Sequence, residues 1–242
     1  MKNISLFTAL SISILILEIG CSDAVTEVNY DRIDTRLELT LKEELLADSR
    51  SLSLDCATIR IYPCINYGID YSMTKSGNKI TIRFNQIIMP DICLTALGPA
   101  YSNIKLGNLS NGQYILNLMV NGITQTAILK VNDSTFKIEY KPGFGFIFKK
   151  TELKRIPQNV IWVSVGYISD TLTTSVNSFL DSLTNIGASE IYLSPGDYGH
   201  FQIDSFGEIV APEYHGYPFI KMFLYEFNGN SESLKALIRN TN

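Results

Sequence analysis

Residues 113–131, with the sequence QYILNLMVNGITQTAILKV, decide the fold of the first half of the chain. Two strand-like runs, Gln113–Val120 and Thr124–Val131, flank Asn121-Gly122. This dipeptide is the strongest short-range signal for a β-hairpin, because both of its residues tolerate a positive φ. The stretch therefore predicts two antiparallel strands joined by a tight turn.

The same pattern extends outward from this hairpin. Ile69–Thr74 and Ile80–Phe84 flank a turn at residues 75–78, and Thr135–Tyr140 follows as a further strand. Between Thr58 and Tyr140 no helical periodicity interrupts these short runs. Short strands at this spacing predict a β-sandwich.

The stretch LSNGQYIL at residues 109–116 resembles the G-x-Y-x-L strand start of immunoglobulin-like domains. The resemblance implies an immunoglobulin-like β-sandwich over residues 56–141. It also implies that Tyr114 occupies the tyrosine corner, with its hydroxyl bonded back to the main chain. The motif is widespread, so it implies a fold and no function.

Three cysteines, Cys56, Cys64 and Cys93, follow Cys21 in the chain. A hairpin that turns at Ser76-Gly77 brings Cys64 close to Cys93, so we predict a Cys64–Cys93 disulfide. A Cys56–Cys93 disulfide and three unpaired buried thiols are the alternatives. There is no close C-x-x-C pair and neither histidine is near, so we predict no metal site and no cofactor.

The N-terminus indicates export. A positive start precedes Ile4–Leu17, an apolar run that suits a signal peptide and is too short for a transmembrane helix. The following Leu17-Glu18-Ile19-Gly20-Cys21 resembles the cleavage site of bacterial lipoproteins, except that Glu18 stands where that family usually has Leu. The resemblance implies a signal peptide over residues 1–20. It also implies that Cys21 carries fatty acyl chains such as palmitate, which attach the protein to a membrane.

Ser22 resembles the residue that directs lipoproteins to the outer membrane. We therefore expect a lipid-anchored protein of the bacterial cell envelope. Residues 21–55 are expected to hold a lipidated tether followed by a segment of ambiguous structure. In that segment Leu37, Leu39 and Leu41 alternate as in a strand, whereas Leu37, Leu41 and Leu45 would line one face of a helix.

Residues 142–156 are expected to be a linker, because Pro142, Gly143 and Gly145 interrupt the strand pattern. Four basic residues in or near it suggest either a patch that rests on anionic lipid headgroups or a solvated linker face. These residues are Lys149, Lys150, Lys154 and Arg155.

Residues 157–242 are expected to form a small α+β domain with two helices packed on one face of a sheet. Val160–Ile168 is an apolar strand, and the helix after Ser169-Asp170 places six apolar residues on one face and ends at Gly187. These six are Leu172, Val176, Phe179, Leu180, Leu183 and Ile186. Later strands are predicted at 190–193, 201–203 and 219–227, and a short helix at 231–239. Aromatic residues in the 219–227 strand are expected to be core.

Candidate site residues gather in this second domain. A ligand site is predicted from four tyrosines and the two histidines of the chain: Tyr192, Tyr198, Tyr214, Tyr217, His200 and His215. Asp197, Asp204, Glu208 and Glu213 lie near the histidines in sequence, so an acid–base site is an alternative. No catalytic residues are assigned, because the chain contains neither a G-x-S-x-G elbow nor a glycine-rich phosphate loop.

The net charge of −4 argues against nucleic acid as a partner. The function that these features favour is a membrane-anchored, non-enzymatic binding or accessory module of the envelope, with a protein or a polysaccharide as its partner. The alternatives are an envelope hydrolase that uses His200 or His215 with a nearby carboxylate, and an inhibitor-like or structural module.

Overall fold

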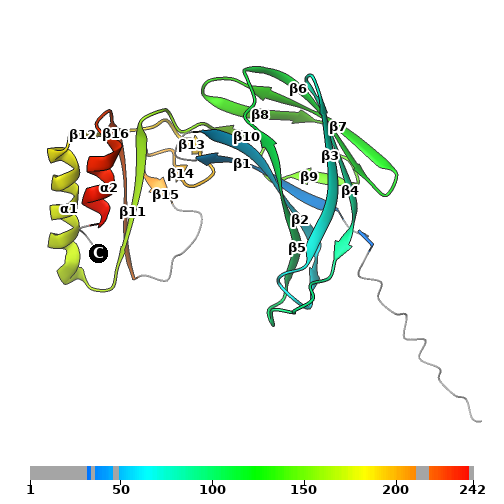
Figure 1. Ribbon diagram of the computed structural model, residues 1–242, viewed down its shortest axis with the longest axis horizontal. Helices are drawn as coiled ribbons and strands as arrows, with labels where there is room; N and C mark the ends of the chain where they lie inside the picture. Colours follow the sequence, from blue (N-terminus) through cyan, green and yellow to red (C-terminus); the bar gives the residue numbers. More distant parts are fainter. Residues whose placement is uncertain (1–31, 34–35, 46–48, 211–217, 240–242) are drawn as a thin grey trace, which may run out of the picture.

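The computed structural model describes residues 32–33, 36–45, 49–210 and 218–239. These residues are mainly β, and the two α-helices among them lie in the C-terminal part of the chain (Figure 1). Strands β1–β10 form one large sheet, and the remaining six strands form two small sheets beside the helices.

The large sheet contains both predicted hairpins. At the β6–β7 turn, Asn121 has φ 47° and Gly122 has φ 78°, as a two-residue turn of this kind requires. Most neighbours are antiparallel, and the β4–β6, β3–β5 and β1–β9 pairs are parallel. In sheet order the strands are β10 (Glu152–Lys154), β8 (Thr135–Tyr140), β7 (Ile123–Val131), β6 (Gly112–Val120), β4 (Lys79–Ile88), β3 (Gly68–Ser76), β5 (Gly98–Gly107), β2 (Arg50–Tyr62), β1 (Leu37–Leu45) and β9 (Phe146–Phe148).

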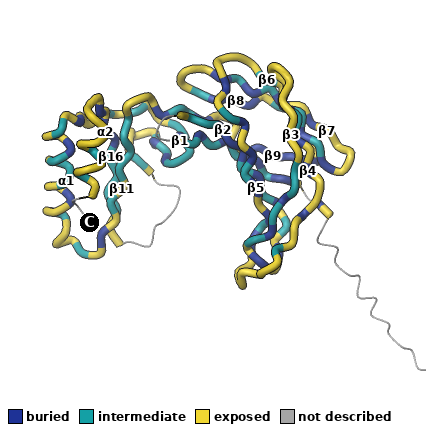
Figure 2. Tube along the Cα trace, in the orientation of Figure 1, coloured by how far each residue is buried: buried dark blue, intermediate teal, exposed yellow. Residues whose placement is uncertain are grey.

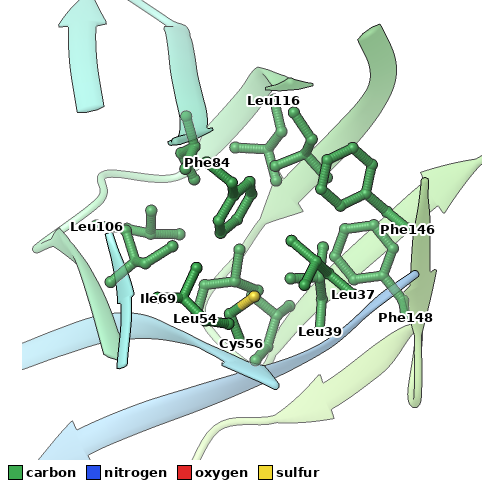
Figure 3. Close-up of a cluster of buried hydrophobic side chains, with 14 of the residues drawn as sticks. Leu37, Leu39, Leu54, Cys56, Ile69, Phe84, Leu106, Leu116, Phe146 and Phe148 are labelled. Carbon is green, nitrogen blue, oxygen red and sulfur yellow. The ribbon is translucent and has the colours of Figure 1, made fainter. Parts of the chain in front are cut away.

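One segment connects the two edges of this sheet. β9 pairs with β1 at one edge and β10 pairs with β8 at the other, and only residues 149–151 separate β9 from β10. The Lys149 amide donates to the Leu39 carbonyl (2.9 Å), and the Ile138 amide donates to the Thr151 carbonyl (2.7 Å). The sheet therefore curves around a single apolar core, part of which Figure 3 shows.

The ambiguous segment and the expected linker both contribute strands to the large sheet. Residues 37–45, which the sequence left open between strand and helix, form β1 with Leu37, Leu39 and Leu41 buried. Residues 142–156 are not a linker, because β9 and β10 lie within them. Three-residue strands are too short to show an alternating pattern, and the nearby Pro and Gly residues obscure it further.

The disulfide joins Cys64 to Cys93, with an Sγ–Sγ distance of 1.98 Å, and this is the pair that the sequence favoured. Cys56 is a free, buried thiol in the core (Figure 3). The two bonded cysteines are 29 residues apart. In the chain-entropy model, closing a loop of this length stabilises the folded state by about 3–4 kcal/mol.

The C-terminal part has three layers. β11 (Val160–Tyr167), β16 (Phe219–Phe227) and β12 (Ala188–Glu190) form an antiparallel sheet in that order. Helices α1 (Thr173–Asn185) and α2 (Ser231–Arg239) lie side by side on one face of it (Figure 1). The opposite face packs against a small sheet of β13 (Gly196–Asp197), β14 (Gln202–Ile203) and β15 (Ile209–Val210).

The start and end of α1 follow the sequence signals. A 3₁₀ turn, η1 (Asp170–Leu172), precedes α1, and Ser169 Oγ accepts a hydrogen bond from the Thr171 amide (3.4 Å). Gly187 follows the helix with φ 97°, the conformation that glycine adopts most easily at this position. Among the aromatic residues of β16, Tyr225 and Phe227 are core and pack beneath the helices, Phe223 is partly buried, and Phe219 is 38% exposed.

The basic residues near β10 connect the two parts of the molecule. Lys150 pairs with Asp197, and Lys154 Nζ donates to Ser194 Oγ (2.7 Å), so both side chains reach from the large sheet to the C-terminal part. Lys149 pairs with Glu38 inside the large sheet (2.6 Å). These basic side chains are therefore engaged in intramolecular contacts.

Arg155 belongs to a buried charge cluster at the same junction. Its Nε donates to Glu43 Oε1 (3.1 Å), and Arg50 lies 3.7 Å from the other Glu43 oxygen. Arg50 also donates to the carbonyls of Ile156 and Pro157, which begin the C-terminal part. Only 3% of the Glu43 side chain is exposed, so its charge is balanced by the two guanidinium groups rather than by water.

Candidate binding site

Of the four predicted tyrosines, the structure describes Tyr192 and Tyr198, and these two lie in different surroundings. Tyr198 is 4% exposed, donates through its hydroxyl to the Ser194 carbonyl (3.0 Å) and stacks on Phe201, so it is part of the core. Tyr192 is 84% exposed. Tyr214, His215 and Tyr217 lie outside the described residues, as does Cys21. A tyrosine cluster that includes Tyr198 is therefore not available to a ligand.

His200 contributes to the junction between the two parts of the molecule. Its Nε2 lies 3.0 Å from the main-chain carbonyl oxygen of Glu43, and its ring lies 6.1 Å from that of Trp162. The nearby carboxylates have other partners, since Asp197 accepts from the Gly199 amide and Asp204 accepts from the amides of two residues that follow it. In the described part of the chain, the contacts of Asp197 and Asp204 stabilise turns, and the contact of His200 stabilises the junction.

Two described groups with a raised pKa, the Cys56 thiol and the Tyr101 hydroxyl, are disfavoured as nucleophiles. Burial raises the pKa of the Cys56 thiol well above its ordinary value, so the thiolate that nucleophilic chemistry needs is disfavoured. Burial and the hydrogen bond from its hydroxyl to Asp55 raise the pKa of Tyr101 to about 12. Among the described residues, no three histidine, cysteine or carboxylate side chains converge as a metal site would require.

An apolar cavity of about 480 Å³ lies between the helices and the β11 side of their sheet. Pockets that bind small molecules or apolar side chains have volumes of about 300–1,000 Å³. Tyr167 is stacked on Phe219 and lines the cavity with the serines Ser164 and Ser175. The apolar lining residues are Ile161, Trp162, Val163, Val165, Leu172, Val176, Phe179, Leu183, Leu234 and Ile238.

The cavity exists because the two helices cover the sheet incompletely. α2 contains no buried residue, and α1 buries only Val176 and Leu183. Leu172 and Ile238 line the cavity and are 40% and 50% exposed. The apolar stripe of a helix normally packs fully against its sheet, so these helices leave unfilled apolar surface beside β11.

β11 itself has one unpaired edge. Over its eight residues it pairs with β16, and in the described part of the chain no second strand pairs with it. Val160–Val163 and Val165 are only partly buried, and Ser164 and Gly166 are exposed. An exposed, unpaired, apolar edge strand presents main-chain donors and acceptors that another strand can bond.

A second cavity of about 290 Å³ lies on the other face of the same sheet, between β16 and β15. Tyr192 lines it together with Glu190 and Glu208. The exposed Tyr192 ring gives a sugar one surface to stack on. A polysaccharide would therefore make fewer stacking contacts here than at a site formed by several tyrosines.

Comparison with known proteins gives no relative: no family model, curated protein or solved structure matches the chain. Neither described helix has the length and apolar character needed to cross a bilayer.

The cavity and the unpaired edge were not foreseen from the sequence. The strand at 160–168 and the apolar face of α1 were both predicted, but the incomplete contact between them was not. The one sequence signal was that α2 has only nine residues, too few to cover the length of β11 and β16.

Proposed function

We propose that the protein is a lipid-anchored, non-enzymatic binding module of the bacterial envelope that holds an extended segment of a partner protein along β11. The observation that carries this proposal is the unpaired edge of β11 beside the 480 Å³ apolar cavity. The anchor is supported by the apolar N-terminal run and by the lipoprotein-like residues before Cys21.

Strand addition explains both features at once. A partner strand would bond to the main chain of β11, which supplies affinity without regard to sequence. Its alternate side chains would point toward the helices, where Val163, Val165 and Val176 offer apolar contacts. The cavity would then select a partner with a large apolar side chain at one position.

We also propose that the large sheet is an immunoglobulin-like β-sandwich that carries this binding unit. The Tyr114 hydroxyl donates to the Ser110 carbonyl (2.9 Å), the bond expected of a tyrosine corner. The ladder between β3 and β5 consists of the single pair Gly68–Tyr101, so the ten strands divide there into groups of six and four. This division supports two packed sheets.

A photo-crosslinking amino acid at Ser164 tests the proposed binding surface in cells that express the protein. Ser164 is exposed in the middle of β11, so we expect a crosslinked adduct of discrete mass. Adding Ser175→Trp places an indole in the cavity, because Ser175 lies on its wall. Excluding one apolar side chain of the partner should reduce the adduct about tenfold or more.

The matched control is Asn177→Trp, which adds the same side chain at an exposed position of α1 outside the cavity wall. We expect the adduct to persist in this variant. An equal adduct yield in both tryptophan variants, or no adduct at Ser164, would overturn the proposal. Unchanged thermal unfolding of the two variants excludes misfolding as the cause.

A further inference from the structure

Large apolar side chains are concentrated at one end of the large sheet, at the last residue of β4 and in the loops that join β2 to β3 and β4 to β5. We call this group the apolar tip. Its members are between 47% and 77% exposed: Ile65, Ile88, Met89, Ile92, Leu94 and Leu97. Figures 1 and 2 show exposed chain where β2 ends and β5 begins, at the bottom of the large sheet in this view. Scattered exposed apolar residues are normal, but six at one end of a sheet mark an interaction surface.

The tip is held in this exposed arrangement. The disulfide Cys64–Cys93 joins its two loops. Asn66 also connects the two loops. Its Nδ2 donates to the Ile92 carbonyl (2.7 Å), and its Oδ1 accepts from the Leu94 amide (3.1 Å). The loop backbone is thus fixed by bonds of its own while its apolar side chains project into solvent. A fixed apolar surface loses little conformational entropy when it binds.

The chain enters the large sheet at this same end. The Ile59 amide donates to the Arg36 carbonyl (3.2 Å), and Asn121 at the β6–β7 turn donates to the Ile33 carbonyl. The parallel register of β4 and β6 places Phe84 beside Val120, so Ile88 extends beyond the end of β6, in the direction of that turn. The first described residues and the apolar tip therefore lie at one end of the sheet, and the charge cluster at Glu43 lies at the other end of β1.

The tether is short. Arg32 is the eleventh residue after Cys21, and eleven residues span roughly 36 Å at full extension. A membrane that holds Cys21 is therefore always near the end of the domain where the tip projects. A protein partner could bind an apolar surface anywhere on the molecule. The position of the tip at the same end of the sheet as the first described residues therefore favours the bilayer as its partner.

We propose that the apolar tip docks on the lipid bilayer, with its side chains in the boundary between headgroups and acyl chains. This proposal rests on the anchor proposed above, because the anchor keeps the tip at the bilayer. Docking at one end of the large sheet would hold the molecule in a fixed orientation on the membrane. Neutral lipids are sufficient, since the members of the tip carry no charge.

The test uses the full chain, isolated from membranes and reconstituted in vesicles of phosphatidylcholine and phosphatidylethanolamine. An environment-sensitive fluorescent amino acid is introduced genetically at Ile92, or at Ser110 as a control. Ser110 is exposed and lies between β5 and β6, at the other end of the sheet. We expect the emission at position 92 to shift to shorter wavelength and to be quenched by spin-labelled lipid, and the emission at position 110 to remain as in water.

The other outcomes distinguish a failure of the anchor proposal from a failure of the tip proposal. If the chain floats with vesicles while position 92 stays in water, the tip proposal fails and the anchor survives. If the chain does not float, both fail. If Ile92→Ser/Leu97→Ser abolishes flotation, the tip binds but the anchor fails. A shift at position 92 without vesicles would identify self-association instead of lipid docking, and equal shifts at both positions would also overturn the proposal.

Discussion

Phe146→Ala is expected to lower the free energy of unfolding by about 3–5 kcal/mol, the cost of removing a buried aromatic ring that leaves a cavity. Phe146 is fully buried, and its ring centroid lies 5.5 Å from that of Phe84 on the opposite side of the core (Figure 3). It also belongs to β9, the strand that joins the two edges of the sheet through residues 149–151. Urea unfolding followed by far-ultraviolet circular dichroism measures the loss.

Phe144→Ala is the matched control, because Phe144 is two residues away and 89% exposed. A surface substitution of this kind should change stability by no more than about 0.5 kcal/mol. If both variants lost the same small amount, the segment that contains β9 would not pack against the core as described.

Glu43→Gln is expected to destabilise the protein by about 3 kcal/mol, because it removes the single negative charge that Arg50 and Arg155 share in a buried site. Trp162 is the only tryptophan of the chain and lies near this junction, so its fluorescence reports on the C-terminal part. We expect the fluorescence transition in urea to move to a lower concentration and to separate from the circular dichroism transition.

Glu44→Gln is the control, since Glu44 is the next residue of β1 and faces the other side of the strand. Both transitions should remain coincident in this variant, with a change within about 0.5 kcal/mol. Coincident and unshifted transitions in Glu43→Gln would mean that the charge cluster does not couple the two parts.

Much of the fold followed from local sequence rules. The Asn121-Gly122 turn, the helix that ends before Gly187 and the strand at 219–227 each depend on neighbouring residues, and each is present. Cys64–Cys93 followed from a hairpin whose turn was already indicated.

The errors arose where distant residues decide the structure. Leu37, Leu39 and Leu41 allowed two interpretations until the pairing of β1 with β2 was known. Arg155 and its basic neighbours appeared as a surface run, yet partners such as Glu43 lie far away in the sequence. Tyr198 suggested a site as one of several loop tyrosines, and His200 did so because carboxylates lie near it in the chain. Packing instead directs Tyr198 to the core and His200 to the junction.

The candidate binding surface is a cavity between β11 and the helices. A hydrophobic pattern indicates which residues face the core, but it does not indicate whether their side chains fill the space between them. Val163 and Val176 have the periodicity of fully packed elements although a cavity lies between them. The apolar tip, unlike the cavity, has a signal in the sequence, because IMPDICLTAL at residues 88–97 is unusually apolar for a loop.

Hydrogen–deuterium exchange at residues 160–167 measures the pairing of β11 amide by amide. In the free protein, alternate amides should exchange slowly because they bond to β16, and the others should exchange quickly because they face the unpaired edge. With the partner captured at Ser164 present at about 100 times its Kd, the fast set should slow roughly a hundredfold. Protection of both sets in the free protein, or a fast set that the bound partner leaves unchanged, would contradict strand addition at β11.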